Sequence, residues 1–250
     1  MIFRQLLDRE TCTYTYLLAD AGSKEAVLID PVKEQFERDN QILAELGLKL
    51  VYTLETHVHA DHVTSSGRFR QRFGSRSAIS SLSGAGCADI QLADGDEIRF
   101  GRHVLRARTT PGHTDGCMTF VMDDPKMAFT GDTLMIRGCG RTDFQQGCPD
   151  RLYESVHGKI FTLPGETRIY PGHDYKGRMS STVAEERAHN PRLGGGRSLE
   201  EFRAIMGSLD LSYPKRIDVA VPANLKCGLP QEPVEGAVEY SPSADDAWAP

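Results

Sequence analysis

Short apolar runs rich in β-branched and aromatic residues recur along the chain, with turn residues between them. Such runs predict strands, because these side chains fit a pleated and partly buried surface. Gly- and Asp-containing turns between three pairs of runs predict hairpins. The predicted strands are residues 13–20, 26–30, 48–56, 76–80, 97–100, 103–109, 118–122, 126–130 and 167–170.

Apolar residues at helical spacing predict amphipathic helices between and after these strands. Residues 34–46 show this pattern and end at Gly47, a residue common just beyond a helix. With the strands on either side, this helix forms a β-α-β step. The further predicted helices are residues 67–73, 149–161, 183–189 and 199–209.

Strands and helices occur in two successive groups, each with its own set of strands. The fold class that fits best is α/β, an αββα sandwich in which two mixed sheets pack face to face and helices flank both. A single doubly wound parallel sheet is the second choice. We expect one domain over residues 1–230 and a loosely held tail, rich in proline and acids, over residues 231–250.

Composition narrows the class of protein. The 250 residues are 39% apolar and 26% charged, with a net charge of −6 spread along the chain. These values are typical of a soluble globular protein and, without a clustered basic face, argue against a nucleic-acid partner. Residues 1–10 lack the features of a secretory signal, and no apolar run reaches membrane-spanning length. We therefore expect no membrane contact and a cytoplasmic location.

Six cysteines are widely spread, without a Cys-x-x-Cys pair. In a chain of this size that pattern predicts reduced thiols rather than a disulfide framework. The tail could lie on a neighbouring subunit, so a homodimer is one assembly to test.

The segment Thr56–His62, which reads Thr-His-Val-His-Ala-Asp-His, begins where the predicted strand 48–56 ends. It places His57, His59, Asp61 and His62 within six residues. Buried polar groups cost free energy unless they find partners, and metal coordination would provide them. The alternative is a surface loop whose histidines are solvated, which the compactness of this set disfavours.

Three more polar residues follow predicted strands, and each comes directly after a glycine: His113, Asp132 and His173. Glycine lets the backbone turn tightly and lets a ligand come near. Each residue alone could be an ordinary turn or helix-start residue. Three such cases at strand ends favour one site on a rim of the sheets. The candidate ligands are His57, His59, Asp61, His62, His113, Asp132 and His173.

This layout resembles the metallo-β-lactamase superfamily, whose fold is the αββα sandwich, over roughly residues 14–173. In hydrolases of that superfamily, the position of Asp132 bridges two metals. The first metal takes positions matching His57, His59 and His113, and the second takes those matching Asp61, His62 and His173.

Later motifs resemble one branch, the persulfide dioxygenases, which are non-haem iron enzymes related to glyoxalase II. These motifs are residues 138–147, Pro171-Gly172-His173-Asp174-Tyr175, Asn190-Pro191-Arg192 and residues 221–228. The resemblance implies an enzyme that oxidises glutathione persulfide with dioxygen to sulfite and glutathione. It implies one Fe(II) per chain, held by His57, His113 and Asp132.

Under this resemblance His59, Asp61, His62 and His173 orient the ligands through hydrogen bonds. Two imidazoles and one carboxylate on one face of Fe(II) form a facial triad that leaves positions for dioxygen and sulfur.

Glutathione carries two carboxylates, so its pocket should offer cations and phenols. Arg141, Tyr175 and Lys226 are the predicted contacts, against alternatives of a solvated arginine, a partly buried tyrosine and a surface lysine. Cys139 lies in the same loop as Arg141, and we interpret it as an inert buried thiol rather than a catalytic one.

Two competing functions remain open. A binuclear hydrolase of glutathione thioesters, of the glyoxalase II type, is compatible with the complete set of seven ligand candidates. The chain after His173 is short, however, and lacks an obvious pair of basic helices for glutathione. A metal-free binding module is the third hypothesis, and it leaves the complete ligand set without a role.

Overall fold

Two six-stranded sheets pack face to face in the computed structural model, which describes residues 1–229. The first has the order β1-β2-β3-β4-β5-β6, with bounds Ile2–Leu7, Tyr14–Ala19, Glu25–Ile29, Lys49–Leu54, Arg76–Ser80 and Ile90–Leu92. The second has the order β12-β11-β10-β9-β8-β7. From β7 to β12 its bounds are Glu97–Phe100, His103–Thr109, Met118–Met122, Met127–Gly131, Arg168–Pro171 and Ser181–Thr182.

Both sheets are mixed, as the sequence predicts. The three predicted hairpins form antiparallel pairs, β2 with β3, β7 with β8 and β9 with β10. The predicted β-α-β step is also confirmed, since β3 and β4 pair in parallel and a helix connects them along the chain.

Alternating side chains of the strands build the core. Tyr16 and Leu18 of β2 point between the sheets, where they join Phe120 and Phe129 of the second sheet. Leu17, one position along, points to the outer face and packs beneath helices. Strands buried on both faces hold the two sheets and their helices together.

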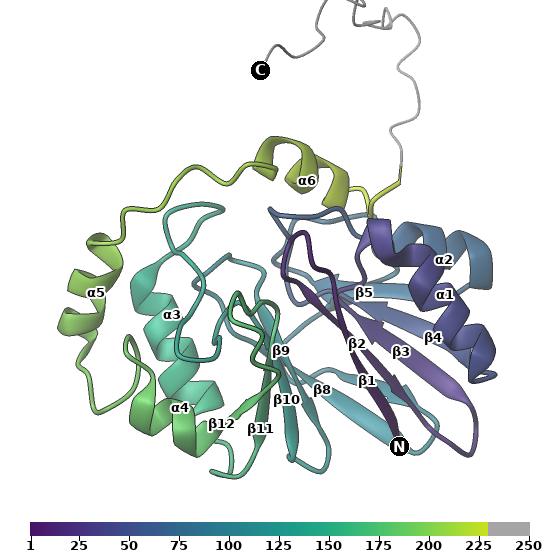
Figure 1. The fold of residues 1–250 in the computed structure, drawn as a ribbon, viewed down its shortest axis with the longest axis horizontal. Coiled ribbons are helices and arrows are strands. Elements are labelled where there is room, and N and C mark those ends of the chain that lie inside the picture. The colour runs from purple at the N-terminus through teal and green to yellow at the C-terminus, as the bar shows by residue number, and fades with distance from the viewer. Residues whose placement is uncertain (230–250) are drawn as a thin grey trace, which may run out of the picture.

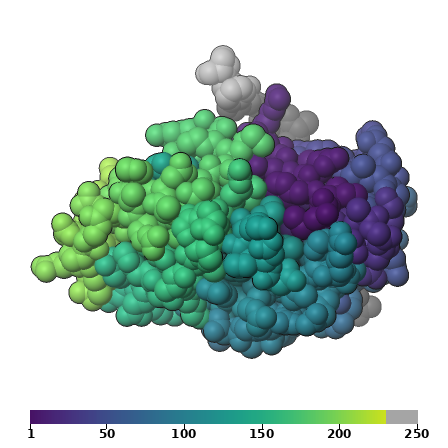
Figure 2. Space-filling view, turned by 90° about the horizontal axis from the view of Figure 1, so that it is seen from below, coloured from purple at the N-terminus to yellow at the C-terminus, as the bar shows by residue number. Residues whose placement is uncertain are grey.

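Helices cover the outer face of each sheet (Figure 1). On the first sheet lie α1 and α2, whose bounds are Phe36–Glu45 and Ser66–Phe73, with a 3-10 turn at Lys33–Gln35. On the second lie α3, α4 and α5, with bounds Pro149–Ser155, Val183–His189 and Leu199–Gly207; a π-helical turn at Val156–Ile160 extends α3. The αββα sandwich is therefore confirmed, and the single doubly wound sheet is excluded. Figure 2 shows the lower face, where N-terminal and later segments lie side by side.

Three strands and one helix were not predicted from the sequence, because their residues lack the expected hydrophobic pattern. β1 carries Arg4 and Gln5 in mid-strand, β6 has three residues and β12 has two. The helix α6, Ile217–Asn224, contains Pro222 and has weak amphipathic spacing. The predicted tail at residues 231–250, and with it the domain boundary, lies outside the described residues. Within residues 1–229, no helix combines the length and the apolar character needed to cross a bilayer.

The prediction that all six cysteines are reduced is wrong. Cys87 and Cys227 form a disulfide across a sequence separation of 140 residues. The segment after α6 returns to the loop that follows β5, which brings the two Cα atoms within 5.9 Å. Sequence spacing carries no sign of this contact, because it depends on where α6 docks. The free thiols include Cys117 and Cys139, both buried.

Candidate metal centre

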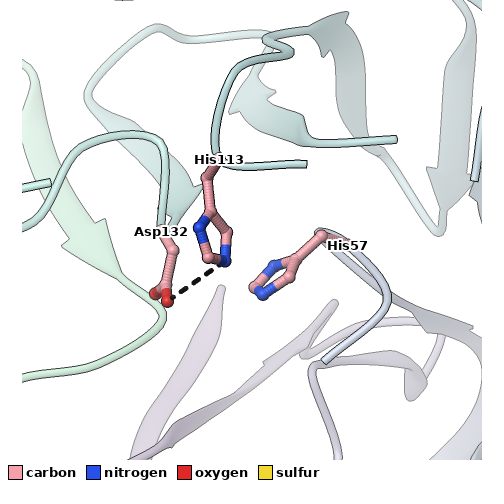
Figure 3. Close-up of side chains that lie close together, drawn as sticks. All are labelled: His57, His113 and Asp132. Atoms are coloured by element: carbon pink, nitrogen blue, oxygen red, sulfur yellow. Dashed lines mark ion pairs between the residues drawn. The ribbon is translucent and has the colours of Figure 1, made fainter. Parts of the chain in front are cut away.

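All seven ligand candidates converge at one rim of the sandwich. His57 follows β4, His113 follows β8, Asp132 follows β10 and His173 follows β11. One ligand atom from each of His57, His113 and Asp132 lies within 4.8 Å of the others. Figure 3 shows these three side chains pointing toward a common centre. The segments that carry them are far apart in the sequence, so the fold itself assembles the site.

Glycines permit this close approach. Gly131 has a φ of 51°, and a Cβ there would lie 2.6 Å from the Thr56 hydroxyl oxygen. A Cβ on Gly172 would lie 2.8 Å from Oδ1 of Asp132. Only glycine fits both positions without displacing a side chain of the centre, which accounts for the glycines that precede Asp132 and His173.

Hydrogen bonds orient the two imidazoles of this group. Nδ1 of His57 lies 3.0 Å from the Thr56 hydroxyl, which itself donates to Asp30 over 2.8 Å. The hydroxyl oxygen therefore accepts the Nδ1 proton of His57. Nδ1 of His113 donates to the carbonyl of Arg141 over 2.7 Å. In both rings Nε2 is left with a free lone pair, the form a metal binds.

The charge states suit a metal as well. Burial, together with the neighbouring imidazoles of His59 and His113, holds the pKa of His57 well below its ordinary value. Burial alone would raise the pKa of Asp132, but His173, followed by His113 and His57, holds it well below the usual range. A neutral imidazole and an ionised carboxylate are the protonation states required for coordination.

The other four candidates are tied to one another and to carboxylates. Oδ2 of Asp61 lies 2.9 Å from Nδ1 of His62 and 3.0 Å from Nε2 of His173. Nδ1 of His173 lies 2.8 Å from Oδ1 of Asp132. Against the effect of burial, the carboxylates of Asp132 and Asp61 raise the pKa of His173 well above its ordinary value. The ring is thus an imidazolium that bridges two carboxylates.

His59 lies beside carboxylates without the hydrogen bonds that hold His173. Its Nε2 lies 3.2 Å from Asp30 and 3.6 Å from Glu55. Although burial lowers the pKa of His59, Asp30, Asp61 and Glu55 raise it to about 9. His59, Asp61 and His62 nevertheless bring ligand atoms within 4.8 Å of one another. Within residues 1–229, neither ring nitrogen of His59 nor Nε2 of His62 has a hydrogen-bond partner. A neighbouring second metal position is therefore geometrically preserved.

A cavity of about 960 Å³ opens over the centre. His57, His113, Asp132 and His173 form its floor, and seven basic residues line its walls. Sequence reasoning assigned a substrate contact to one of the seven, Arg141. Arg192 lies in the Asn190-Pro191-Arg192 motif but received no role, and the other five are scattered and carry no motif. The basic lining residues are Arg137, Arg141, Lys176, Arg178, Arg192, Lys215 and Arg216.

The predicted substrate contacts have different positions. Arg141 lines the cavity, where its guanidinium pairs with Asp143 through contacts of 2.6 and 2.7 Å and lies over the ring of Phe144. Tyr175 also lines it, with 69% of its surface exposed. Lys226 lies on the exposed turn after α6 and is not part of the lining, so its contact with substrate stays a prediction.

Cys139 is buried beside the centre, and burial raises the pKa of its thiol to about 11. A neutral thiol at physiological pH is a poor nucleophile, in agreement with the interpretation of an inert residue.

Sequence reasoning missed three residues that support the centre: Thr13, Asp30 and Asn224. Thr13 lies 3.0 Å from both Asp61 and His173, and Asp30 holds the backbone and side chain of Thr56. The position of Asp30 at the end of a predicted strand was an available signal. Asn224 lies in the motif of residues 221–228, although nothing in that motif indicates its contact with the loop, and Thr13 carries no signal.

Comparisons with known proteins agree with this geometry. Residues 11–85 and 88–173 match the metallo-beta-lactamase superfamily. The chain is 59% identical over 230 residues to "Persulfide dioxygenase ETHE1, mitochondrial" of Homo sapiens, covering 92% of this chain and 89% of that one. The crystal structure of ETHE1 from Myxococcus xanthus superposes with a TM-score of 0.89 at 52% identity, covering 92% of this chain and all of the other. A hydroxyacylglutathione hydrolase from Cereibacter sphaeroides is 34% identical over 187 residues, 72% of this chain and 69% of its own.

Proposed function

The chain belongs to the metallo-beta-lactamase superfamily and, within it, to the persulfide dioxygenases, and from that premise we propose that it oxidises glutathione persulfide at a single ferrous ion. In the overall reaction the persulfide's terminal sulfur leaves as sulfite. The oxygen atoms of sulfite come from dioxygen and water, and the remaining thiol leaves as glutathione. The protein itself ends the cycle unchanged.

The observation that carries the proposal is the donor set of His57, His113 and Asp132. Each side chain has one ligand atom directed at the shared centre and the other tied by a hydrogen bond. Two imidazoles and one carboxylate form the facial triad that suits Fe(II). When bound there, ferrous iron supplies open coordination positions at which dioxygen and a persulfide sulfur can react.

The residues of the chain fix the geometry of this reaction. Thr56 and the Arg141 carbonyl set the rings of His57 and His113, while His173 occupies one oxygen of Asp132. That leaves the other carboxylate oxygen for the metal. Preorganised ligands of this kind bring both reactants together without a further ordering cost.

The walls of the cavity fit the proposed substrate. Glutathione persulfide carries two carboxylates, and the lining offers cations for both. Within residues 1–229, Lys176, Arg192 and Lys215 form no ion pair, whereas the other four basic lining residues pair with carboxylates of the chain. We assign Arg141 and Tyr175 to substrate contacts, since both line the cavity that contains the metal ligands. Lys226 does not line the cavity, and we keep it as the third proposed contact.

Anaerobic loading with Fe(II), metal quantitation and an oxygen electrode test the proposal together. We expect about one iron per chain, and oxygen uptake with sulfite formation when glutathione persulfide is added. The same protein loaded with Zn(II) is the matched control. It should bind substrate without oxygen uptake, because Zn(II) has no redox chemistry. Iron-loaded protein that consumes no oxygen would refute the activity.

The second candidate function is the binuclear hydrolase. The convergence of His59, Asp61 and His62 favours it, as does the similarity to the hydroxyacylglutathione hydrolase. It predicts two metals per active chain and hydrolysis of S-lactoylglutathione without oxygen. Against it, the two ring nitrogens of His173 bridge Asp61 and Asp132, so a second metal held by His173 would have to displace a proton.

The assembly and the cellular location also belong to the proposal. A homodimer is to be tested by light scattering. We keep the cytoplasm as the predicted location, although the mammalian relatives carry the word mitochondrial in their names. Fractionation of the source cells would decide between them.

A further inference from the structure

The side chain of Asn224, the last residue of α6, reaches the loop that carries the histidines. Its Nδ2 donates to the carbonyl of His59 over 2.9 Å and to that of His62 over 2.8 Å. Its Oδ1 accepts from the backbone N–H of Thr64 over 2.8 Å. With 6% of its surface exposed, the carboxamide has satisfied its hydrogen-bonding capacity almost entirely on this one loop.

The segment after α6 is fixed against the same region. The carbonyl of Cys227 accepts from the N–H of Gly67 over 2.9 Å, and Cys227 is joined to Cys87 by the disulfide. Gly228 has a φ of 70° and lies so close to Thr64 that a Cβ would fall 2.0 Å from its carbonyl oxygen. Figure 1 shows α6 set apart from the helices that cover the sheets. Val221 of α6 and Leu225 directly after it pack against the cluster of Val58, Ile79 and Ala85, so the helix docks on the histidine loop and on β5 with the loop that follows it.

The two carbonyls held by Asn224 flank Asp61, whose side chain connects the loop to the metal ligands. Oδ2 of Asp61 lies 3.0 Å from Nε2 of His173, and Nδ1 of His173 lies 2.8 Å from Oδ1 of Asp132. His173 thereby keeps one oxygen of Asp132 occupied and the other directed at the centre. A shift of the loop would move Asp61, turn His173 and release Asp132.

We propose that Asn224 is a positioning residue for the metal centre, acting through the backbone of residues 59–64 and the Asp61, His173 and Asp132 side chains. This inference rests on the proposed assignment of Asp132 as a metal ligand. It adds a requirement for α6, whose residue Asn224 is not among the proposed ligands and does not line the cavity. A hydrogen-bonding partner that orients metal ligands typically changes metal affinity by about 10- to 100-fold.

The test is titration of the metal-free full-length protein with Co(II), followed by visible absorption. Asn224→Ala should weaken Co(II) binding by about 10-fold or more, as expected for a partner that orients the ligands. It should also alter the absorption bands, which report coordination geometry. Asn224→Asp should act in the same direction, because it keeps the acceptor for Thr64 but replaces the two donors by a carboxylate facing carbonyls.

Leu43→Ala is the control for a general loss of stability, since Leu43 is buried in α1 on the outer face of the first sheet. It should destabilise the fold and leave Co(II) affinity and spectrum as in the wild type. Wild-type affinity in Asn224→Ala, or an equal loss in Leu43→Ala, would overturn the inference.

Hydrogen exchange on the wild-type protein is a second test, and it does not depend on whether a variant folds. The amide of Thr64 should exchange slowly in metal-free protein, because Asn224 holds it, and fast exchange would contradict the proposal. Co(II) binding is measured without persulfide or dioxygen. An inactive enzyme would therefore refute the proposed activity without affecting this inference.

Discussion

The centre contains two groups of similar side chains with opposite chemical states. His57 and His113 donate hydrogen bonds from Nδ1–H to neutral acceptors, a hydroxyl and a carbonyl. His59 and His173 lie against carboxylates, which raise the pKa of both imidazoles despite their burial. The first pair is therefore available to a metal. Of the second pair, His173 is held between two carboxylates, while His59 lies beside them with neither ring nitrogen hydrogen-bonded within residues 1–229. Residue type alone does not assign a ligand here, since the partner of each ring nitrogen decides its role.

The largest effect should come from the group that faces the metal. Asp132→Ala removes the only carboxylate of the proposed triad. We therefore expect iron retention and turnover to fall together. The loss should exceed about 100-fold, the upper end of the effect of a residue that only orients a ligand. Metal quantitation after desalting and an oxygen electrode measure both. Asp124→Ala, which removes an exposed carboxylate paired with Lys126, is the matched control. A variant that keeps its iron and full oxygen consumption would show that the triad is misassigned.

The second group should respond less. His173→Gln removes the imidazolium between Asp61 and Asp132 but leaves all three proposed ligands in place. We expect metal affinity to fall by about 10- to 100-fold, with one metal still bound per chain at saturation. Isothermal titration with Fe(II) under argon gives both numbers. If the wild type instead binds two metals and the variant one, His173 is itself a ligand, and the two groups are equivalent.

Local sequence pattern predicted the strands and the loops of the first group of side chains. The strands that deliver His57, His113 and Asp132 are apolar runs ended by glycine or polar turns, so both the αββα sandwich and the three loops followed from local pattern. Interactions between residues close together in the sequence decide such features, so a single sequence is enough to predict them.

Long-range partners could not be predicted. Asp30 contacts Thr56 across 26 positions, and Asn224 contacts His59 across 165. Cys227 finds Cys87 only because α6 docks against the loop after β5. None of these residues differs locally from an ordinary turn or helix-end residue. Their roles arise from tertiary contacts, which is also why the charge states of the histidines could not be read from the His-x-His-x-Asp-His segment.

A smaller effect should separate the metal ligands from the substrate pocket. Arg141→Ala removes a guanidinium that lines the cavity, while its backbone carbonyl still orients His113. We expect the KM for glutathione persulfide to rise about tenfold, consistent with loss of one charged hydrogen bond, with kcat little changed. Steady-state oxygen uptake measures both constants. Lys226→Ala is the informative partner variant, and an equal rise in its KM would bring Lys226 into the pocket.

The smallest effect concerns the stability of the metal-free protein. The pKa of His59 is about 9 in the folded protein and 6.5 ordinarily, because the nearby carboxylates of Asp30, Asp61 and Glu55 outweigh its burial. The folded state thus binds a proton that the unfolded state releases. This contribution to stability is complete below pH 6.5 and is lost as the pH rises to about 9. Urea unfolding at both pH values should show a larger decrease in the free energy of unfolding for the wild type than for His59→Gln. Equal decreases would mean that His59 is neutral when folded.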